Sequence, residues 1–197
     1  MTDYSSTIVE SILTAIQNLN TGRFIIGIDG PSASGKSTLA NELIGYLNNT
    51  EIICMDNFYK PGELRNEADR INEIGSYFDW RRLEKQVLIP FKNNLDIVYD
   101  NYDWMTDRIS GSKHISRKHN IIVEGVYSIR KELANYYNYK IWIDCPYETR
   151  LQRGIIRDGI EMKDYWETVW MKQENEYMAA HKSSSYADFI IDQAASL

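Results

Sequence analysis

The sequence predicts an α/β fold: a doubly wound, mainly parallel five-stranded sheet with helices on both faces and a small lid helix. Five short apolar runs rich in β-branched residues lie near positions 24, 52, 121, 141 and 189, and such runs are typical of buried strands. Segments with helical spacing of apolar residues lie between them, and this alternation indicates a parallel sheet. The third observation is that the first run leads through a glycine-rich loop directly into a helix.

Length and composition fit a single domain over residues 1–197. The chain has 43% apolar and 25% charged residues, and it shows no repeat, low-complexity tract or linker. A net charge of −6 argues against a broad surface for nucleic acid or anionic membranes. No stretch approaches a transmembrane span and no signal-peptide pattern is present, so a cytoplasmic enzyme is expected. Cys54 and Cys145 are expected to be buried thiols rather than a disulfide or a metal site.

The glycine-rich loop, residues 30–37, reads G-x-x-x-x-G-K-S. Gly30 and Gly35 permit backbone angles that turn N–H groups inward around a chain of phosphates. The following helix points its free N–H groups and its positive dipole at the same place. Lys36 supplies a charge for the β and γ phosphates, and the Ser37 hydroxyl is a Mg²⁺ ligand. The expected nucleotide site consists of Gly30, Ser32, Ala33, Ser34, Gly35, Lys36, Ser37 and Thr38.

Two carboxylates stand at the ends of predicted strands, where functional groups gather in a parallel sheet. Asp56 follows the strand at 51–55, and a carboxylate there could accept a proton from an attacking hydroxyl, bind the metal, or do both. Taken alone, such an Asp is more often a turn or cap residue. Glu124 ends the strand at 120–125 and is expected to hold the metal directly or through water, or else merely to end the strand. The glycine-rich loop upstream favours the functional interpretation of both acids.

The remaining elements follow from apolar spacing and turn residues. An N-terminal helix over about 5–19 is expected to cover one face of the sheet. Asp79 is the expected N-cap of a helix that Pro90 should kink or end. The other expectations are a long surface loop at 61–78, a strand or hairpin arm at 95–102, a loop at 105–118 and a helix around 130–137.

A lid is predicted over about 147–163. Arg150, Arg153 and Arg157 recur at i, i+3 and i+7, so they share one helical face. Such a face is usually solvated, but in a phosphoryl-transfer enzyme it can close over the phosphates and supply positive charge. Gly154 and Gly159 weaken the helix, which suits a mobile element. A last helix over 164–181 and a final strand over 186–192 follow.

Several separated stretches resemble the uridine kinase family of P-loop kinases, over most of the chain. They are the phosphate loop with its following Ser, Met-Asp-x-Phe-Tyr-Lys-Pro at 55–61, Tyr-Phe-Asp at 77–79, Tyr-Asp-Trp at 102–104, Val-Glu-Gly at 123–125, the arginine-bearing helix at 148–158, and Tyr-Ala-Asp-Phe-Ile-Ile at 186–191. The phosphate loop is common to many enzymes. Asp-x-Phe-Tyr-Lys and Tyr-Ala-Asp, in this order and spacing, are far more specific.

The resemblance implies ATP-dependent phosphorylation of the 5′-hydroxyl of uridine or cytidine, with ATP and Mg²⁺ as cofactors. It makes Asp56 the general base and a metal neighbour, with Ser37 and Glu124 completing the Mg²⁺ shell. It places Asp79 on the ribose hydroxyls and Tyr102 against the nucleoside. It also assigns the three lid arginines to the phosphates, or in part to the acceptor, and it implies that the protein could form homo-oligomers.

Two departures from the family pattern bear on the base. Where the family commonly has a His that reads the pyrimidine edge, five residues after Tyr102, this chain has Asp107, and an ionised acid cannot donate to a carbonyl. The segment at 159–162 is short and lacks the usual further arginines. A nicotinamide riboside kinase is therefore an alternative, since that relative has a similar Asp-x-Phe-Phe-Lys-Pro segment and a pyridinium base could tolerate Asp107 better.

Two further questions stay open. Aromatic residues around Tyr59, Tyr77, Trp80, Tyr102 and Trp104 suggest a pocket for a flat ring, but they could equally belong to the core. Tyr59 and Asp107 accordingly join Asp79 and Tyr102 as candidate substrate-binding residues. A P-loop ATPase switch without a small-molecule acceptor is the alternative of a different class. The Asn-Lys-x-Asp motif of guanine-nucleotide switches is absent from the sequence.

Overall fold

A computed structural model describes residues 4–66, 68 and 73–194 of the chain. Its main sheet has five strands: β1 (Ile25–Asp29), β2 (Thr50–Cys54), β5 (Asn120–Glu124), β6 (Tyr139–Asp144) and β7 (Phe189–Asp192). The order across the sheet is β2-β5-β1-β6-β7, and every neighbouring pair is parallel. The predicted five-stranded parallel sheet is confirmed. Its register aligns Cys54 with Glu124 and Glu124 with Ile28, so these strands end at a common edge.

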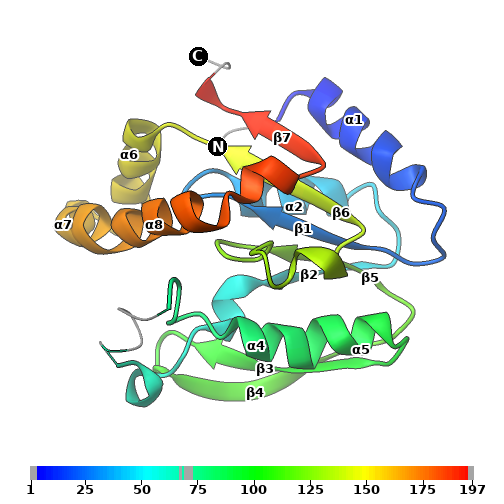
Figure 1. Ribbon diagram of the computed structural model, residues 1–197, viewed down its shortest axis with the longest axis horizontal. Helices are drawn as coiled ribbons and strands as arrows, with labels where there is room; N and C mark the ends of the chain where they lie inside the picture. Colours follow the sequence, from blue (N-terminus) through cyan, green and yellow to red (C-terminus); the bar gives the residue numbers. More distant parts are fainter. Residues whose placement is uncertain (1–3, 67, 69–72, 195–197) are drawn as a thin grey trace.

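Helical elements cover both faces of the sheet, as predicted (Figure 1). On one face, α1 (Ser6–Gln17) and α2 (Lys36–Ile44) pack against Ile26, Ile28 and other residues of alternate strand positions. On the other face, α8 (Met171–His181) and the helix at 80–92 pack against a second cluster that includes Ile25. Alternate residues of β1 thus enter opposite layers, which explains why this strand reads as a continuous apolar run.

A second sheet has no counterpart in the prediction. It is an antiparallel hairpin of β3 (Ile97–Asp103) and β4 (Arg108–Ile115), and in Figure 1 it lies with helices α4 and α5 beneath the main sheet. The hairpin arm at 95–102 is confirmed, but the loop predicted over 105–118 is wrong. All residues of β4 except Ile115 are exposed, so the strand has no apolar alternation to reveal it. Backbone pairing with β3 decides its structure.

The helix at 80–92 continues through Pro90. It consists of α4 (Trp80–Leu83), a π-helical turn (Glu84–Leu88) and α5 (Ile89–Lys92). The π-helical turn comes directly before the segment with Pro90, which lacks an N–H and crowds the preceding turn. The Asp79 side chain accepts a hydrogen bond from Arg82 N at 3.0 Å, so the predicted N-cap is confirmed. The predicted loop at 61–78 lies partly outside the described residues.

The helix predicted around 130–137 is wrong. Only a short 3₁₀ turn, Ala134–Tyr136, forms there. The preceding segment is instead attached to the end of β1: the N–H groups of Tyr127 and Ile129 donate to the Asp29 carboxylate at 3.2 and 3.0 Å. The Tyr137 hydroxyl donates to Ser128 O at 2.7 Å. These bonds attach residues 127–129 to the end of β1 and hold the Tyr137 side chain against Ser128, while the backbone of 130–137 forms only local turns.

The predicted lid region begins with α6 (Tyr147–Asp158), and a 3₁₀ turn (Ile160–Met162) follows it. The last predicted helix is confirmed as α7 (Lys163–Tyr165), a π-helical turn (Trp166–Trp170) and α8. In Figure 1 these helices lie together at one end of the sheet.

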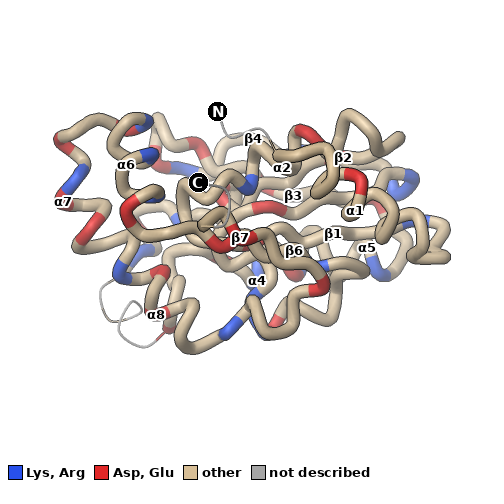
Figure 2. Tube along the Cα trace, turned by 90° about the horizontal axis from the view of Figure 1, so that it is seen from above, with Lys and Arg blue, Asp and Glu red and all other residues tan. Residues whose placement is uncertain are grey.

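No helix among the described residues is long and apolar enough to cross a membrane. Figure 2 shows basic and acidic residues interspersed over the elements.

Gly154 allows α6 to approach Trp166 closely, so it has a packing role besides any effect on helix stability. A Cβ built on Gly154 would lie 2.5 Å from the Trp166 ring. We expect Gly154→Ala to lower the free energy of unfolding by about 1–2 kcal/mol, because overpacking outweighs the gain in helix propensity. Thermal unfolding measures this, with Gly22→Ala as the control because nothing lies within 4 Å of a Cβ there. A higher Tm for Gly154→Ala would show that the contact is loose.

Candidate active site

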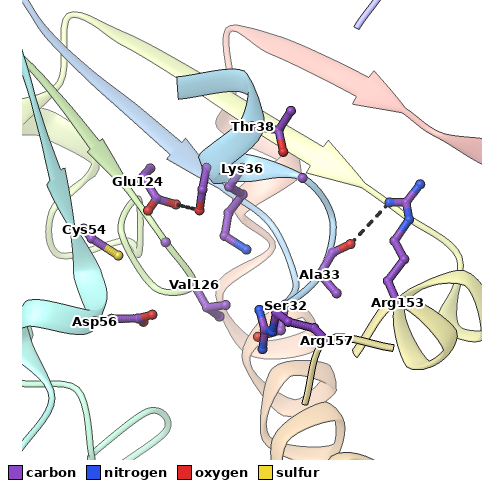
Figure 3. A pocket seen from close by; sticks show the side chains of 13 residues that line it. Ser32, Ala33, Lys36, Thr38, Cys54, Asp56, Glu124, Val126, Arg153 and Arg157 are labelled. Atoms are coloured by element: carbon purple, nitrogen blue, oxygen red, sulfur yellow. Dashed lines mark hydrogen bonds between the residues drawn. The ribbon is translucent and has the colours of Figure 1, made fainter. Parts of the chain in front are cut away.

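A cavity of about 610 Å³ opens beside the glycine-rich loop; we call it the loop cavity. Figure 3 shows how side chains from the loop, from the ends of β2 and β5 and from α6 point toward one space. The structure thereby brings together residues that the sequence places far apart. The lining residues are Ser32, Ala33, Gly35, Lys36, Ser37, Thr38, Cys54, Asp56, Glu124, Gly125, Val126, Arg153 and Arg157.

The loop has the backbone shape that the glycines were expected to provide. Gly30 and Gly35 have φ of +147° and +95°, and Ala33 is also left-handed at +59°. A Cβ on Gly30 would lie 2.4 Å from Ile143 O, so no larger residue fits there. Gly30 and Ser34, both predicted nucleotide ligands, do not line the cavity. Ser34 is fully buried beneath the loop, and its carbonyl accepts a hydrogen bond from Gln193 Nε2 at 2.9 Å.

Asp29, the last residue of β1, organises the loop and was missed as a site residue. Its buried carboxylate accepts hydrogen bonds from Gly30 N and from the Tyr177 hydroxyl at 2.7 and 2.6 Å, besides the two from the segment after β5. Burial raises the pKa of Asp29 to about 6, and these hydrogen bonds oppose that shift. Asp29 could have been found in the sequence by the pattern that identified Asp56 and Glu124, because it too is an acid at the end of an apolar run.

Three oxygen-bearing side chains face the loop cavity beside the Lys36 ammonium. The Ser37 hydroxyl donates to Glu124 Oε2 at 3.1 Å, and Glu124 is 4% exposed (Figure 3). Burial raises the pKa of Asp56 most, and the negative charge of Glu124 raises it further. The positive charge of Lys36 lowers it in part. The Lys36 ammonium itself donates to Pro31 O at 2.9 Å.

This set of donors suits Mg²⁺. Among the described residues, no group of three or more His, Cys, Asp or Glu side chains could hold a metal ion. Mg²⁺ does not need such a group, because it commonly uses one or two carboxylates and takes its other oxygens from water and from substrate phosphates. Ser37, Glu124 and Asp56 provide one hydroxyl and two carboxylates. A divalent cation between the two acids would also relieve the mutual repulsion that raises the pKa of Asp56.

The three lid arginines have different environments. Arg153 Nη1 donates to Ala33 O at 3.3 Å and to Gln193 Oε1 at 2.7 Å, which places it over the loop (Figure 3). Arg157 lines the loop cavity and donates twice to Asp158. Arg150 is 3% exposed and does not line the cavity. Its guanidinium forms a buried ion pair with Glu174 at 2.9 Å and also donates to Cys145 O, so the structure does not bring it to the nucleotide site.

A second cavity, about 330 Å³ in volume, adjoins the first; we call it the aromatic cavity. Ser32, Asp56, Val126 and Arg157 line both cavities, so they form the junction. The other walls come from the β2–α4 segment, the hairpin turn, the segment after β5, and the lid with α8. They consist of Tyr59, Phe78, Trp104, Tyr127, Asp158, Trp166, Trp170, Gln173 and Glu174. The sequence indicated Tyr59 and Trp104, whereas the contributions from 166–174 read only as parts of a helix.

Of the four candidate substrate-binding residues, only Tyr59 lines the aromatic cavity. Asp79 caps α4. Tyr102 is 4% exposed and packs against Tyr59 and Trp104, with ring centroids 5.4 and 5.0 Å away. Tyr102 therefore supports the cavity wall from behind, and Asp79 does not face the cavity.

Asp107 does not line either cavity, because its carboxylate is engaged elsewhere. It accepts hydrogen bonds from the Tyr102 hydroxyl at 2.5 Å, from Gly62 N at 3.1 Å and from Arg65 Nη2 at 2.7 Å. The hydrogen bond from Tyr102 is the largest of the effects that lower the pKa of Asp107, so the group stays ionised. Asp107 thus joins the hairpin turn to the 62–65 segment, next to the stacked rings of Tyr59 and Trp104.

We expect Asp107→Asn to raise KM for the acceptor severalfold and to leave KM for ATP unchanged. The substitution weakens the ion pair to Arg65 that holds the Tyr59 and Trp104 wall. The pair is partly exposed, so stability should change little. Steady-state kinetics with each substrate varied in turn measures this. Asp96→Asn, at the far end of the same hairpin, is the control. An unchanged acceptor KM would contradict the positioning role.

Known proteins resemble this chain along most of its length. The sequence profile of the phosphoribulokinase/uridine kinase family matches residues 25–196. The uridine-cytidine kinase B of Dictyostelium discoideum is 31% identical over 202 aligned positions, which cover 91% of this chain and 80% of that protein. The uridine kinase of Ureaplasma parvum is 35% identical over 153 positions, covering 74% of this chain and 73% of that one. The structure of a possible uridine kinase from Bacillus stearothermophilus superposes with a TM-score of 0.73 at 25% identity, covering 93% of this chain and 97% of that chain.

Proposed function

The chain belongs to the phosphoribulokinase/uridine kinase family, and we propose that it is an ATP-dependent kinase that phosphorylates the 5′-hydroxyl of a pyrimidine ribonucleoside, uridine or cytidine. One observation supports this most directly: Asp56 and Arg157 line both the loop cavity and the aromatic cavity. A carboxylate and a guanidinium therefore stand between a space suited to phosphates and a space suited to a flat ring. A cytoplasmic location and a homo-oligomeric state stay predictions.

The proposed reaction is an in-line transfer. The acceptor oxygen bonds to the γ-phosphorus, the bond from that phosphorus to the β–γ bridging oxygen breaks, and ADP leaves. Asp56 orients the acceptor hydroxyl and takes its proton. Lys36, Arg153 and Arg157 stabilise negative charge on the phosphates. Mg²⁺, held by Ser37, Glu124 and Asp56, would supply further positive charge when bound.

Release of ADP from ATP and Mg²⁺ tests the proposal, with uridine, cytidine, nicotinamide riboside, adenosine or no acceptor. Strong stimulation by uridine or cytidine is the expected result. Stimulation by nicotinamide riboside alone would keep the chemistry and change the acceptor. Hydrolysis of ATP that no acceptor stimulates would overturn the kinase assignment and leave a P-loop ATPase.

Nicotinamide riboside stays in the panel because of the aromatic cavity. Its walls include the rings of Tyr59, Phe78, Trp104, Trp166 and Trp170. The faces of such rings attract a cationic ring such as a pyridinium. Arg157, a guanidinium lining this cavity, is paired with Asp158 and so repels a cationic ring less than a free guanidinium would.

A further inference from the structure

Most of the charged side chains that line the aromatic cavity are bound to other parts of the protein. Glu174 is paired with the buried Arg150 at 2.9 Å. Asp158 accepts from Arg157 and from Trp166 Nε1, the latter at 3.0 Å. Asp56 stands at the junction with the loop cavity, beside the phosphates. Ion pairs thus hold Glu174 and Asp158, and the other polar groups of the lining include a buried amide.

Gln173 on α8 carries that amide and lines the aromatic cavity. Its Nε2 atom is buried and has no hydrogen-bond partner within the described parts of the chain. Of the residues with such an atom, namely Ser34, Ser76, Tyr99, Asn101 and Gln173, only Gln173 lines the aromatic cavity. A buried amide without a partner destabilises the folded protein, because it has lost its hydrogen bonds to water. Such a group is explained if a ligand completes its hydrogen bonds.

We propose that Gln173 is a specificity-determining residue that binds the polar edge of the pyrimidine base. The proposal rests on the proposed kinase function. Gln173 follows Trp170 by three positions, and both line the aromatic cavity, so the indole can contact the ring while the amide reaches its edge. The Asp56 junction takes the 5′-hydroxyl, which directs the base into the aromatic cavity.

A carboxamide suits both pyrimidines because it carries a donor and an acceptor side by side. Uracil presents a carbonyl next to an N–H, whereas cytosine presents an amino group next to a bare ring nitrogen. Rotation of the amide by half a turn exchanges its donor and acceptor and so matches either base. An ionised Asp107 could not donate to the uracil carbonyl, and it is engaged with Tyr102 and Arg65.

Gln173→Leu is the first test, because leucine keeps much of the volume and removes both polar atoms. KM for uridine and its Kd, measured by calorimetry without ATP, should rise about tenfold, as the loss of one hydrogen bond predicts. KM for ATP and kcat should stay unchanged. Tm should stay equal or rise, because an unsatisfied buried donor has been removed.

Gln86→Leu is the matched control. The Gln86 amide is fully engaged: its Nε2 donates to Asp100 Oδ2 at 2.8 Å and its Oε1 accepts from Asp100 N at 3.1 Å, away from both cavities. This variant should lower Tm and leave both KM values unchanged, which is the opposite pattern. Comparing the two variants separates a ligand-binding glutamine from a structural one.

Gln173→Glu gives a readout that a packing role would not change. The carboxylate keeps an acceptor and loses the donor. The bare ring nitrogen of cytosine can take a proton and then donate to the carboxylate, whereas the uracil carbonyl stays an acceptor, so kcat/KM should fall more for uridine than for cytidine. An unchanged uridine-to-cytidine ratio together with an unchanged uridine Kd in Gln173→Leu would overturn the inference. A wild-type protein that neither pyrimidine stimulates would instead overturn the proposed function, and the inference with it.

Discussion

Asp56→Asn should lower kcat for the nucleoside about 10²- to 10⁴-fold, the range that general-base catalysis contributes. An amide of the same shape cannot take the proton of the 5′-hydroxyl. The carboxylate borders both cavities, so it can reach an acceptor hydroxyl in one and a phosphate in the other. KM for ATP should change little, because Lys36, Ser37 and the loop backbone are untouched. Coupled ADP release, with uridine varied at saturating ATP and ATP varied at saturating uridine, measures both constants.

Two comparisons make the Asp56 result decisive. Asp192→Asn, an acid at the exposed end of β7, should behave as the wild type in the same assay. Thermal unfolding should show Asp56→Asn folded, with a Tm equal to or above the wild-type value because a repelling buried charge is removed. Turnover within tenfold of the wild type would mean that Asp56 orients the acceptor without accepting its proton.

Arg157→Ala should lower kcat by about 10³-fold or more, the effect expected of an arginine that stabilises the charge of a transferring phosphoryl group. Arg157 lines both cavities, so its guanidinium stands where the γ-phosphate passes to the acceptor. Arg153 lines only the loop cavity and is bonded to Ala33 O and Gln193. Arg153→Ala should therefore lower kcat less and raise KM for ATP more. Single-turnover rates at varied ATP concentrations separate a slower chemical step from weaker binding of ATP.

Arg150→Ala is the informative contrast for the lid, because it removes an arginine from the same helical face outside both cavities. It leaves Glu174 as an unpaired buried charge, which typically costs about 3–5 kcal/mol of stability. We expect a large drop in Tm, and at a temperature where the variant is folded, a kcat well above that of Arg157→Ala. Equal kcat losses in all three variants would indicate a general disturbance of the lid.

Local chemistry made much of the site predictable. The phosphate loop is contiguous, and its glycines, Lys36 and Ser37 each have a conformational or chemical reason to be there. Asp56 and Glu124 were found because parallel strands place their carboxyl ends at one edge, and the register indeed aligns Cys54 with Glu124. The same reasoning overlooked Asp29, whose partners lie about one hundred residues away in sequence.

Hydrogen-bond partners distant in sequence account for what was mispredicted. The strand β4 is polar and exposed, so only its pairing with β3 makes it a strand. The helix predicted at 130–137 does not form: the residues just before it are attached to Asp29, and the Tyr137 hydroxyl is bonded to Ser128 O. Helical spacing likewise put Arg150 with Arg153 and Arg157, but a buried carboxylate, Glu174, holds it away from the cavity.

The five strands of the main sheet, the phosphate loop and the acids at the strand ends were encoded within short stretches of the chain. Backbone propensity and side-chain period operate over a few residues, so a reader of the sequence can recover them. The acceptor side was decided by the tertiary structure. The aromatic cavity is lined by residues from positions 32 to 174. Asp107 is bonded to Arg65 outside this cavity, whereas the Gln173 amide lines it and has an unpaired Nε2 atom. Contacts between segments so far apart in sequence depend on how the sheet and its helices pack together. A pattern over a few neighbouring residues does not contain that information.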